Sequence, residues 1–147
     1  MRTFRRVLYA TDFSNASKRA FQAAIGVARA EAAQLLVVHV LPALPLIPDV
    51  YISATTYDEL LRGQRQSCQK QLARLVAKAK AAGARASGIL VDFGVPAERI
   101  ARLAKSKRAD VIVIGTHGRT GLRGALLGSV AARTIVLAPC PVLTVRA

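Results

Sequence analysis

The chain has 147 residues, 52% of them hydrophobic, which fits one folded domain with a full core and excludes a disordered chain. Its 22 Lys and Arg residues against 8 Asp and Glu residues give a net charge of +14, which attracts polyanions such as nucleic acid without specificity. No apolar stretch approaches the ~20 residues that a membrane-spanning helix needs, so we expect no membrane span.

The first third of the chain alternates short apolar runs with a helical pattern. Residues 6–10 form an apolar run that predicts a strand, and residues 15–33 repeat apolar positions on one face of a helix. Residues 35–40 predict a second buried strand. Residues 41–53 contain three prolines and predict a long loop, to which the sequence assigns no role.

The remainder continues the alternation as far as the C-terminus. We expect a helix over residues 55–82, a strand over 86–93, a helix from Pro96, a strand over 110–114, a helix over 130–138 and a strand over 141–145. Apolar strands that alternate with helices predict an α/β fold: one doubly wound, Rossmann-like, five-stranded parallel sheet with helices on both faces, as one domain over residues 1–147. Ligands of such sheets bind at the carboxyl ends of the strands.

The two cysteines and the absence of a signal-peptide pattern predict a cytoplasmic protein with reduced thiols. Cys68 falls in an apolar helical stripe and is expected in the core, whereas Cys140 lies between two prolines and is expected in a turn. There is no CxxC pair and there are only two histidines, which argues against a metal or redox role for either thiol.

A glycine-rich stretch follows the fourth predicted strand. Gly115-Thr116-His117-Gly118 is separated by nine residues from Gly128-Ser129, which leads into the last helix. Glycines let the backbone approach an anion closely and adopt positive φ, and the N–H groups at a helix N-terminus donate to the anion. Ser129 is also a natural N-cap. The spacing therefore predicts a nucleotide-binding site.

Six segments spread over the chain form a wider pattern: residues 9–14 (YATDFS), 36–40 (LVVHV), 94–97 (GVPA), 113–121 (VIGTHGRTG), 127–130 (LGSV) and 139–143 (PCPVL). This pattern resembles the universal stress protein family, and every glycine of the family's motif is present, as in its ATP-binding class. The resemblance implies the strand order 3-2-1-4-5, a homodimer through the C-terminal strand at Val142–Val145, and a stress-response protein that binds ATP or a related adenine nucleotide.

The resemblance also implies roles for single residues. Asp12 engages the ribose or the metal-linked phosphates, with Mg²⁺ or Mn²⁺ accompanying the nucleotide, and Val40 meets adenine through its backbone. The glycines of the fourth strand's loop let amides reach the phosphates, and the start of the last helix holds the distal phosphates. The full expected nucleotide-binding set is Ala10, Asp12, Val40, Ile114, Gly115, Gly118, Arg119, Gly128, Ser129 and Val130.

Several residues keep a second interpretation. Asp12 could instead cap the turn into the first helix, and Arg119 and Arg123 either clamp phosphate or are solvated charges. His117 is favoured as a residue shaped by its glycine neighbours over a catalytic base, and His39 as a packed core histidine.

Three functions follow. The first is a dimeric, nucleotide-responsive regulatory module with an unidentified protein partner. The second is a slow ATPase or phosphotransferase; it is disfavoured because GxxxxGK[ST] is absent and an acid such as Asp92 would have to join Asp12 at the phosphates. The third is a nonspecific polyanion binder, motivated by the net charge of +14.

Overall fold

The five strands form a single parallel sheet, as the sequence pattern predicted, in the order β3-β2-β1-β4-β5 that the family resemblance implied. The computed structural model describes residues 3–118 and 126–147. The strands are β1 (Arg6–Ala10), β2 (Gln34–Val40), β3 (Arg85–Val91), β4 (Val111–Gly115) and β5 (Val142–Val145). The central strands β1, β2 and β4 are almost entirely buried, whereas the edge strands β3 and β5 are half-exposed, which explains why the apolar runs are strongest in the middle of the sheet.

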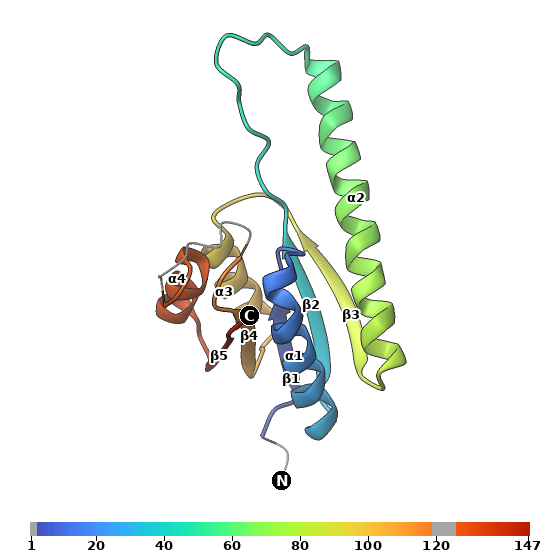
Figure 1. Cartoon of the computed structure of the whole chain (residues 1–147), viewed down its shortest axis with the longest axis vertical. Helices are drawn as coiled ribbons and strands as arrows, with labels where there is room; N and C mark the ends of the chain where they lie inside the picture. Colours follow the sequence, from blue (N-terminus) through green and yellow to red (C-terminus); the bar gives the residue numbers. More distant parts are fainter. Residues whose placement is uncertain (1–2, 119–125) are drawn as a thin grey trace.

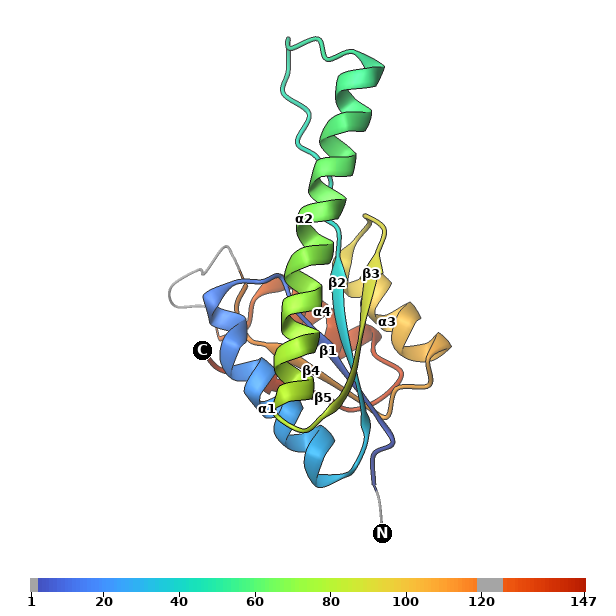
Figure 2. The same cartoon turned by 90° about the vertical axis from the view of Figure 1, so that its right-hand side faces the viewer.

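Within the described ranges, four helices cover the two faces of the sheet (Figures 1 and 2). They are α1 (Lys18–Ala30), α2 (Ala54–Ala81), α3 (Pro96–Ser106) and α4 (Ser129–Leu137). Side chains of α1 and α2 share one hydrophobic cluster with alternate residues of the strands, and side chains of α3 and α4 share a second cluster with the other residues. The fold is therefore doubly wound, and both faces of its sheet are packed.

The predicted helix over residues 15–33 is interrupted at both ends. It begins as a separate 3₁₀ turn, Asn15–Ser17, and α1 itself ends at Ala30. Ala32 then adopts a φ of 49°, and the N–H of Ala33 donates to Ala28 across the helix end at 2.8 Å. The left-handed residue at a helix C-terminus is usually glycine. Because alanines stand here instead, the sequence pattern did not indicate that the helix ends at Ala30.

Helix α2 is much longer than the sheet, and its first half projects beyond it with residues 41–53 (Figures 1 and 2). Its buried residues, Cys68, Leu72 and Ala79, all lie in the second half of the helix. No helix in the described ranges is long and apolar enough to cross a membrane.

Neither cysteine forms a disulfide. Cys68 is buried in α2, as predicted, and Cys140 is half-buried in the turn between α4 and β5. Burial, with a smaller effect from the nearby charge of Asp110, raises the pKa of the Cys140 thiol. The thiolate is thus disfavoured, and Cys140 is a poor nucleophile at neutral pH.

Candidate functional site

A cavity of about 290 Å³ opens at the carboxyl ends of β1, β2 and β4. Its wall includes nine of the ten residues predicted for the site: Ala10, Asp12, Val40, Ile114, Gly115, Gly118, Gly128, Ser129 and Val130. The tenth, Arg119, lies outside the described residues, as does Arg123. The strand order places β1 between β2 and β4, so Asp12 lies between the part of the cavity formed by β2 and the part formed by the glycine loop.

Asp12 occupies a tight turn at the end of β1. Its Oδ1 accepts a hydrogen bond from the N–H of Ser14 at 2.9 Å, and Thr11 Oγ1 accepts one from the N–H of Phe13 at 3.0 Å. Phe13 has a φ of 64°, so the chain reverses sharply here. The turn-capping role considered from the sequence is therefore present, and the same carboxylate also lines the cavity.

A buried polar network holds this turn against α1. Tyr9 donates from its hydroxyl to the Ser17 carbonyl at 2.9 Å, Ser17 donates to the Ser14 carbonyl at 2.7 Å, and the Ser17 and Thr11 hydroxyls lie 3.2 Å apart. Burial raises the pKa of Tyr9, so the phenol stays protonated and donates. Sequence reasoning missed Ser17, whose signal was a polar residue in register with the apolar positions Ala20 and Ala24.

The motif glycines are required for close approach and not for positive φ. Among the described glycines only Gly83 has a positive φ, which corrects the expectation from the sequence. A Cβ atom at Gly118 would overlap Oδ2 of Asp12. A Cβ atom at Gly128 would lie 3.0 Å from the carbonyl oxygen of Thr116, to which the Gly128 N–H itself donates. Two glycines thus bring the β1 turn, the glycine loop and α4 together.

The start of α4 lies one residue earlier than predicted. Gly128 is the N-cap, with φ −69° and ψ 161°, and Ser129 is the first helical residue, so the predicted capping role of Ser129 is wrong. The close contact with Thr116 leaves no space for a side chain at the N-cap position. Ser129, Val130 and Ala131 still line the cavity, and N–H groups in the first helical turn have no acceptor within the helix.

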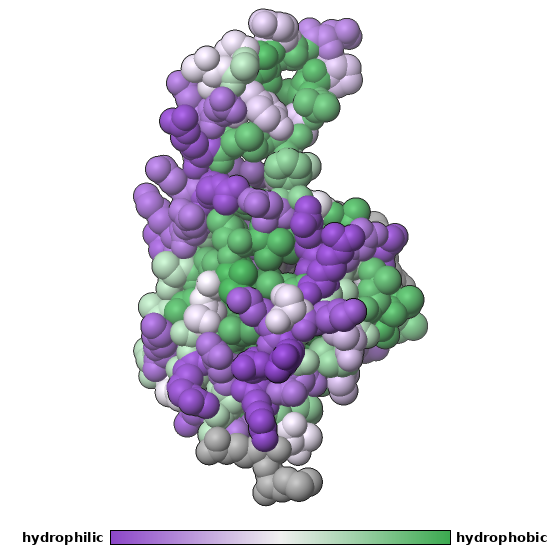
Figure 3. All heavy atoms as spheres, turned by 180° about the vertical axis from the view of Figure 1, so that it is seen from behind, coloured by the Kyte–Doolittle hydropathy of each residue, from purple (hydrophilic) through white to green (hydrophobic). Residues whose placement is uncertain are grey.

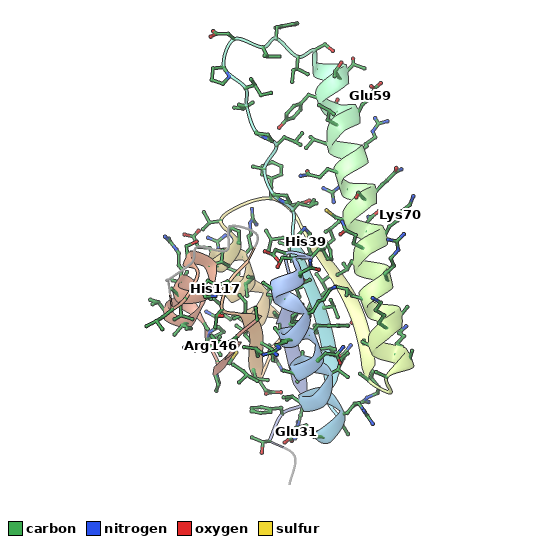
Figure 4. The ribbon with its side chains drawn as sticks, in the orientation of Figure 1. Glu31, His39, Glu59, Lys70, His117 and Arg146 are labelled. Atoms are coloured by element: carbon green, nitrogen blue, oxygen red, sulfur yellow. The ribbon has the colours of Figure 1, made fainter. Side chains whose placement is uncertain are left out.

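The two histidines both line the cavity. His39 is buried, its Nδ1 is 2.8 Å from the Thr11 carbonyl oxygen, and its ring packs on Phe13 at 4.2 Å between centroids, as expected for a core histidine. His117 Nδ1 lies 3.1 Å from the Thr116 hydroxyl. Both imidazoles therefore support the loops of the site; their positions are visible in Figure 4.

An apolar wall completes the cavity on the β2 side. Sequence reasoning missed Pro42, Pro96 and Ile100, which join Val38 and Val40 there. Ile100 belongs to the apolar face of α3. The helical repeat of apolar residues therefore predicted that Ile100 is buried, but not that it lies beside a ligand site. The cavity has an apolar part formed by β2 and α3, and a part rich in backbone amides formed by β4 and α4.

Among the described residues that line the cavity, Asp12 is the only one with a carboxylate. Within residues 3–118 and 126–147 no three His, Cys, Asp or Glu side chains are grouped to hold a metal ion. A single carboxylate fits Mg²⁺ only where phosphate oxygens and water supply the other ligands. Asp92 forms an exposed ion pair with Arg65 at 2.6 Å and does not line the cavity.

Comparison with known proteins reveals extensive similarity. A model of the universal stress protein family matches residues 3–146. A universal stress protein of Thermus aquaticus is 37% identical over 97% of this chain and 99% of its own length, and another from Methanocaldococcus jannaschii is 35% identical over 97% and 82%. The structure of a universal stress protein in complex with cAMP is similar with a TM-score of 0.72 and 29% identity, over 98% of both chains.

Proposed function

The chain belongs to the universal stress protein family, and we propose that it binds an adenine nucleotide, with ATP as the first candidate, as a regulatory module. The observation that carries this proposal is the composition of the cavity along the sheet edge. The apolar wall of Val40 and Ile100 suits a base, Asp12 at the centre suits a ribose or a metal ion, and the N-terminus of α4 suits phosphates. The related structure with cAMP supports an adenine nucleotide.

Calorimetric titration of ATP with Mg²⁺ at physiological salt tests the proposal, with AMP and cAMP titrated in parallel. We expect saturable binding of about one nucleotide per chain that tripolyphosphate does not displace, because the base wall contributes to the affinity. Tripolyphosphate carries the phosphate charge without the base. Complete displacement by tripolyphosphate would reduce the site to a general anion site and contradict the proposal.

Replacing Asp12 by asparagine distinguishes the two roles considered for its carboxylate. Asparagine retains a carbonyl oxygen for the hydrogen bond from Ser14, so the turn is preserved. If Asp12 binds the phosphate-linked metal, we expect Mg-ATP affinity to fall about tenfold and metal-free ATP affinity to rise, because a negative charge is removed beside the phosphates. If Asp12 binds the ribose, both affinities fall. Unchanged affinity for both ligands would remove Asp12 from the site.

We include a homodimer through β5 in the proposal. β5 is an edge strand that, within the described residues, pairs only with β4. Leu143 on β5 is exposed, as are Ile135, Val136 and Leu137 at the end of α4. An unpaired strand edge beside exposed apolar side chains is typical of a surface that pairs with another chain.

Leu143→Glu tests this contact, because a two-fold interface would bring the two carboxylates together. We expect the mass from light scattering to fall because the β5 contact is lost, with the circular dichroism spectrum retained. A monomeric wild-type protein, or a variant of unchanged mass, would contradict the β5 dimer.

A further inference from the structure

Residues 42–67, here called the arm, project from the body of the protein as one leg of loop and one leg of helix (Figures 1 and 2). No residue of the arm is buried. Tyr51 is 93% exposed and Leu46 is 87% exposed, and Ile47, Val50, Ile52 and Leu60 are also exposed. Figure 3 shows hydrophobic atoms gathered near the tip of the arm. Large exposed apolar side chains grouped on a projecting element indicate an interaction surface.

The outer part of the arm, residues 42–61, is also charged oppositely to the rest of the protein. Between residues 41 and 61 there is no Lys or Arg, although the chain contains 22, and there are three of its eight acids: Asp49, Asp58 and Glu59. The other five acids accept hydrogen bonds or form ion pairs within the chain, on Ser14, on the N-terminal strand or on arginines. Within the described residues the three arm acids do neither. The surface complementary to the arm is therefore basic, as is the remainder of this chain.

Helix α2 contains both acidic residues of the arm and a basic surface that could pair with them. Its first two turns carry Asp58 and Glu59 without a basic residue, Arg62 and Arg65 follow, and its second half exposes Lys70, Arg74 and Lys78. Glu59 and Lys70 are eleven residues apart, or about three helical turns, so they lie on the same face of the helix. Figure 4 shows both side chains pointing away from the sheet and from the loop. This outward face is the one that a second molecule can reach.

We propose that two copies of this chain associate through antiparallel α2 helices, with the arm of each copy lying along the basic half of the other. A two-fold axis between residues 64 and 65 places Glu59 of each copy opposite Lys70 of the other. The same register brings Gly63 opposite Gln66, and a Cβ atom at Gly63 would meet nothing within 4 Å, so the helices have space to approach closely.

This interface is separate from the β5 contact, and of the arm residues only Pro42, at the base of the arm, lines the nucleotide cavity. Leu143 and the exposed end of α4 belong to the β5 edge of the sheet, whereas α2 packs on β2 and β3 at the other edge. A protein that used both surfaces would assemble beyond a dimer. The arm contact does not depend on nucleotide binding, so the two proposals are tested separately.

Charge exchange tests the proposed pairing. Sedimentation velocity compares the wild-type protein with Glu59→Lys, Lys70→Glu, the double variant and an equimolar mixture of the two single variants. In a dimer of either single variant, both 59–70 pairs across the interface carry like charges, so we expect self-association to be about tenfold weaker than in the wild type. The double variant and the mixture restore both opposite-charge pairs, and we expect them to associate as the wild type does. Lys105→Glu on α3 changes the net charge by the same amount and sign as Lys70→Glu without altering α2, and should have no effect.

Repeating the same series with the Leu143→Glu substitution added distinguishes the arm interface from the β5 interface, because Leu143→Glu removes the β5 contact. In that background the arm contact alone would produce dimers. Single variants that associate as the wild type does, or a mixture that fails to recover association, would overturn the proposal. A Leu143→Glu protein that remains monomeric at all concentrations while the wild type dimerises would overturn it as well.

Discussion

Replacing Gly128 by valine is expected to weaken nucleotide binding at least about 100-fold, the scale of loss when a positioned group moves by about 1 Å. A Cβ atom there would lie 3.0 Å from the Thr116 carbonyl oxygen and 3.6 Å from the Cα of His117. Both are backbone atoms that cannot rotate away, so the N-terminus of α4 must move from the glycine loop. The hydrogen bond from Gly128 to Thr116 would then break, and the amides of α4 would no longer face the cavity.

Gly118→Val tests the other side of the same arrangement. Its added side chain meets the Asp12 carboxylate, which is a side chain and can rotate, so we expect a loss of binding accompanied by release of the Asp12 turn. Gly26→Val in α1 is the matched control, because a Cβ atom there meets nothing within 4 Å and the position is exposed.

Calorimetry with Mg-ATP and thermal unfolding are measured on all three variants. Normal affinity in both loop variants would show that the cavity is not the nucleotide site. Weakened affinity in the Gly26 control would show that the assay reports on general damage to the fold.

The order of strands and helices was accessible from the sequence because burial of the central strands leaves continuous apolar runs. Val7, Leu8, Val37 and Val113 are all fully buried, so their segments could not be mistaken for loops. The edge strand β3 was less well defined: its run continues to Phe93, but pairing with β2 ends at Val91. A half-exposed edge strand tolerates residues that do not alternate clearly between apolar and polar, so the end of such a strand could not be predicted from the sequence.

The site was predicted where its signal lies in one segment and missed where it requires the folded chain. The carboxyl end of β4 was identified by the glycine-rich stretch that starts at Gly115, and the role of Asp12 at the end of β1 was implied by the family resemblance. Pro96 and Ile100 reach the cavity only because α3 packs beside β2, and no local pattern distinguishes them from other core residues. The shift of the α4 N-cap from Ser129 to Gly128 likewise depends on a contact with Thr116 that capping preferences do not include.

The arm shows a different limit. The prolines of residues 41–53 predicted a loop, and the structure has no helix or strand there. The exposure of this loop depends on how far α2 extends beyond the sheet. Tyr51, in this segment, is almost fully exposed and does not line the cavity. The length of a helix can be estimated from sequence, whereas the point at which the helix leaves the sheet is set by tertiary packing through Leu72 and Ala79.

Leu8→Ala is expected to lower the free energy of unfolding by about 3–5 kcal/mol, the range for a buried leucine whose cavity does not collapse. Leu8 is fully buried in the central strand, and its side chain belongs to the cluster shared with α3 and α4, including Ile100 and Ala104. A domain of this size has a total stability of roughly 7–20 kcal/mol, so the loss is a large fraction. Leu126→Ala, at a position 76% exposed, is the control and should change stability by less than about 0.5 kcal/mol.

Urea unfolding of Leu8→Ala with and without nucleotide separates the fold from the site. A ligand that binds only the folded state adds about 2.7 kcal/mol at a concentration 100 times its Kd. Leu8 does not line the cavity, so we expect the variant to keep most of this increment although its baseline is lower. Gly128→Val should show the reverse, with a baseline closer to wild type and no increment. If Leu8→Ala lost the increment while remaining folded, the core beneath β1 would be positioning the nucleotide site as well as stabilising the sheet.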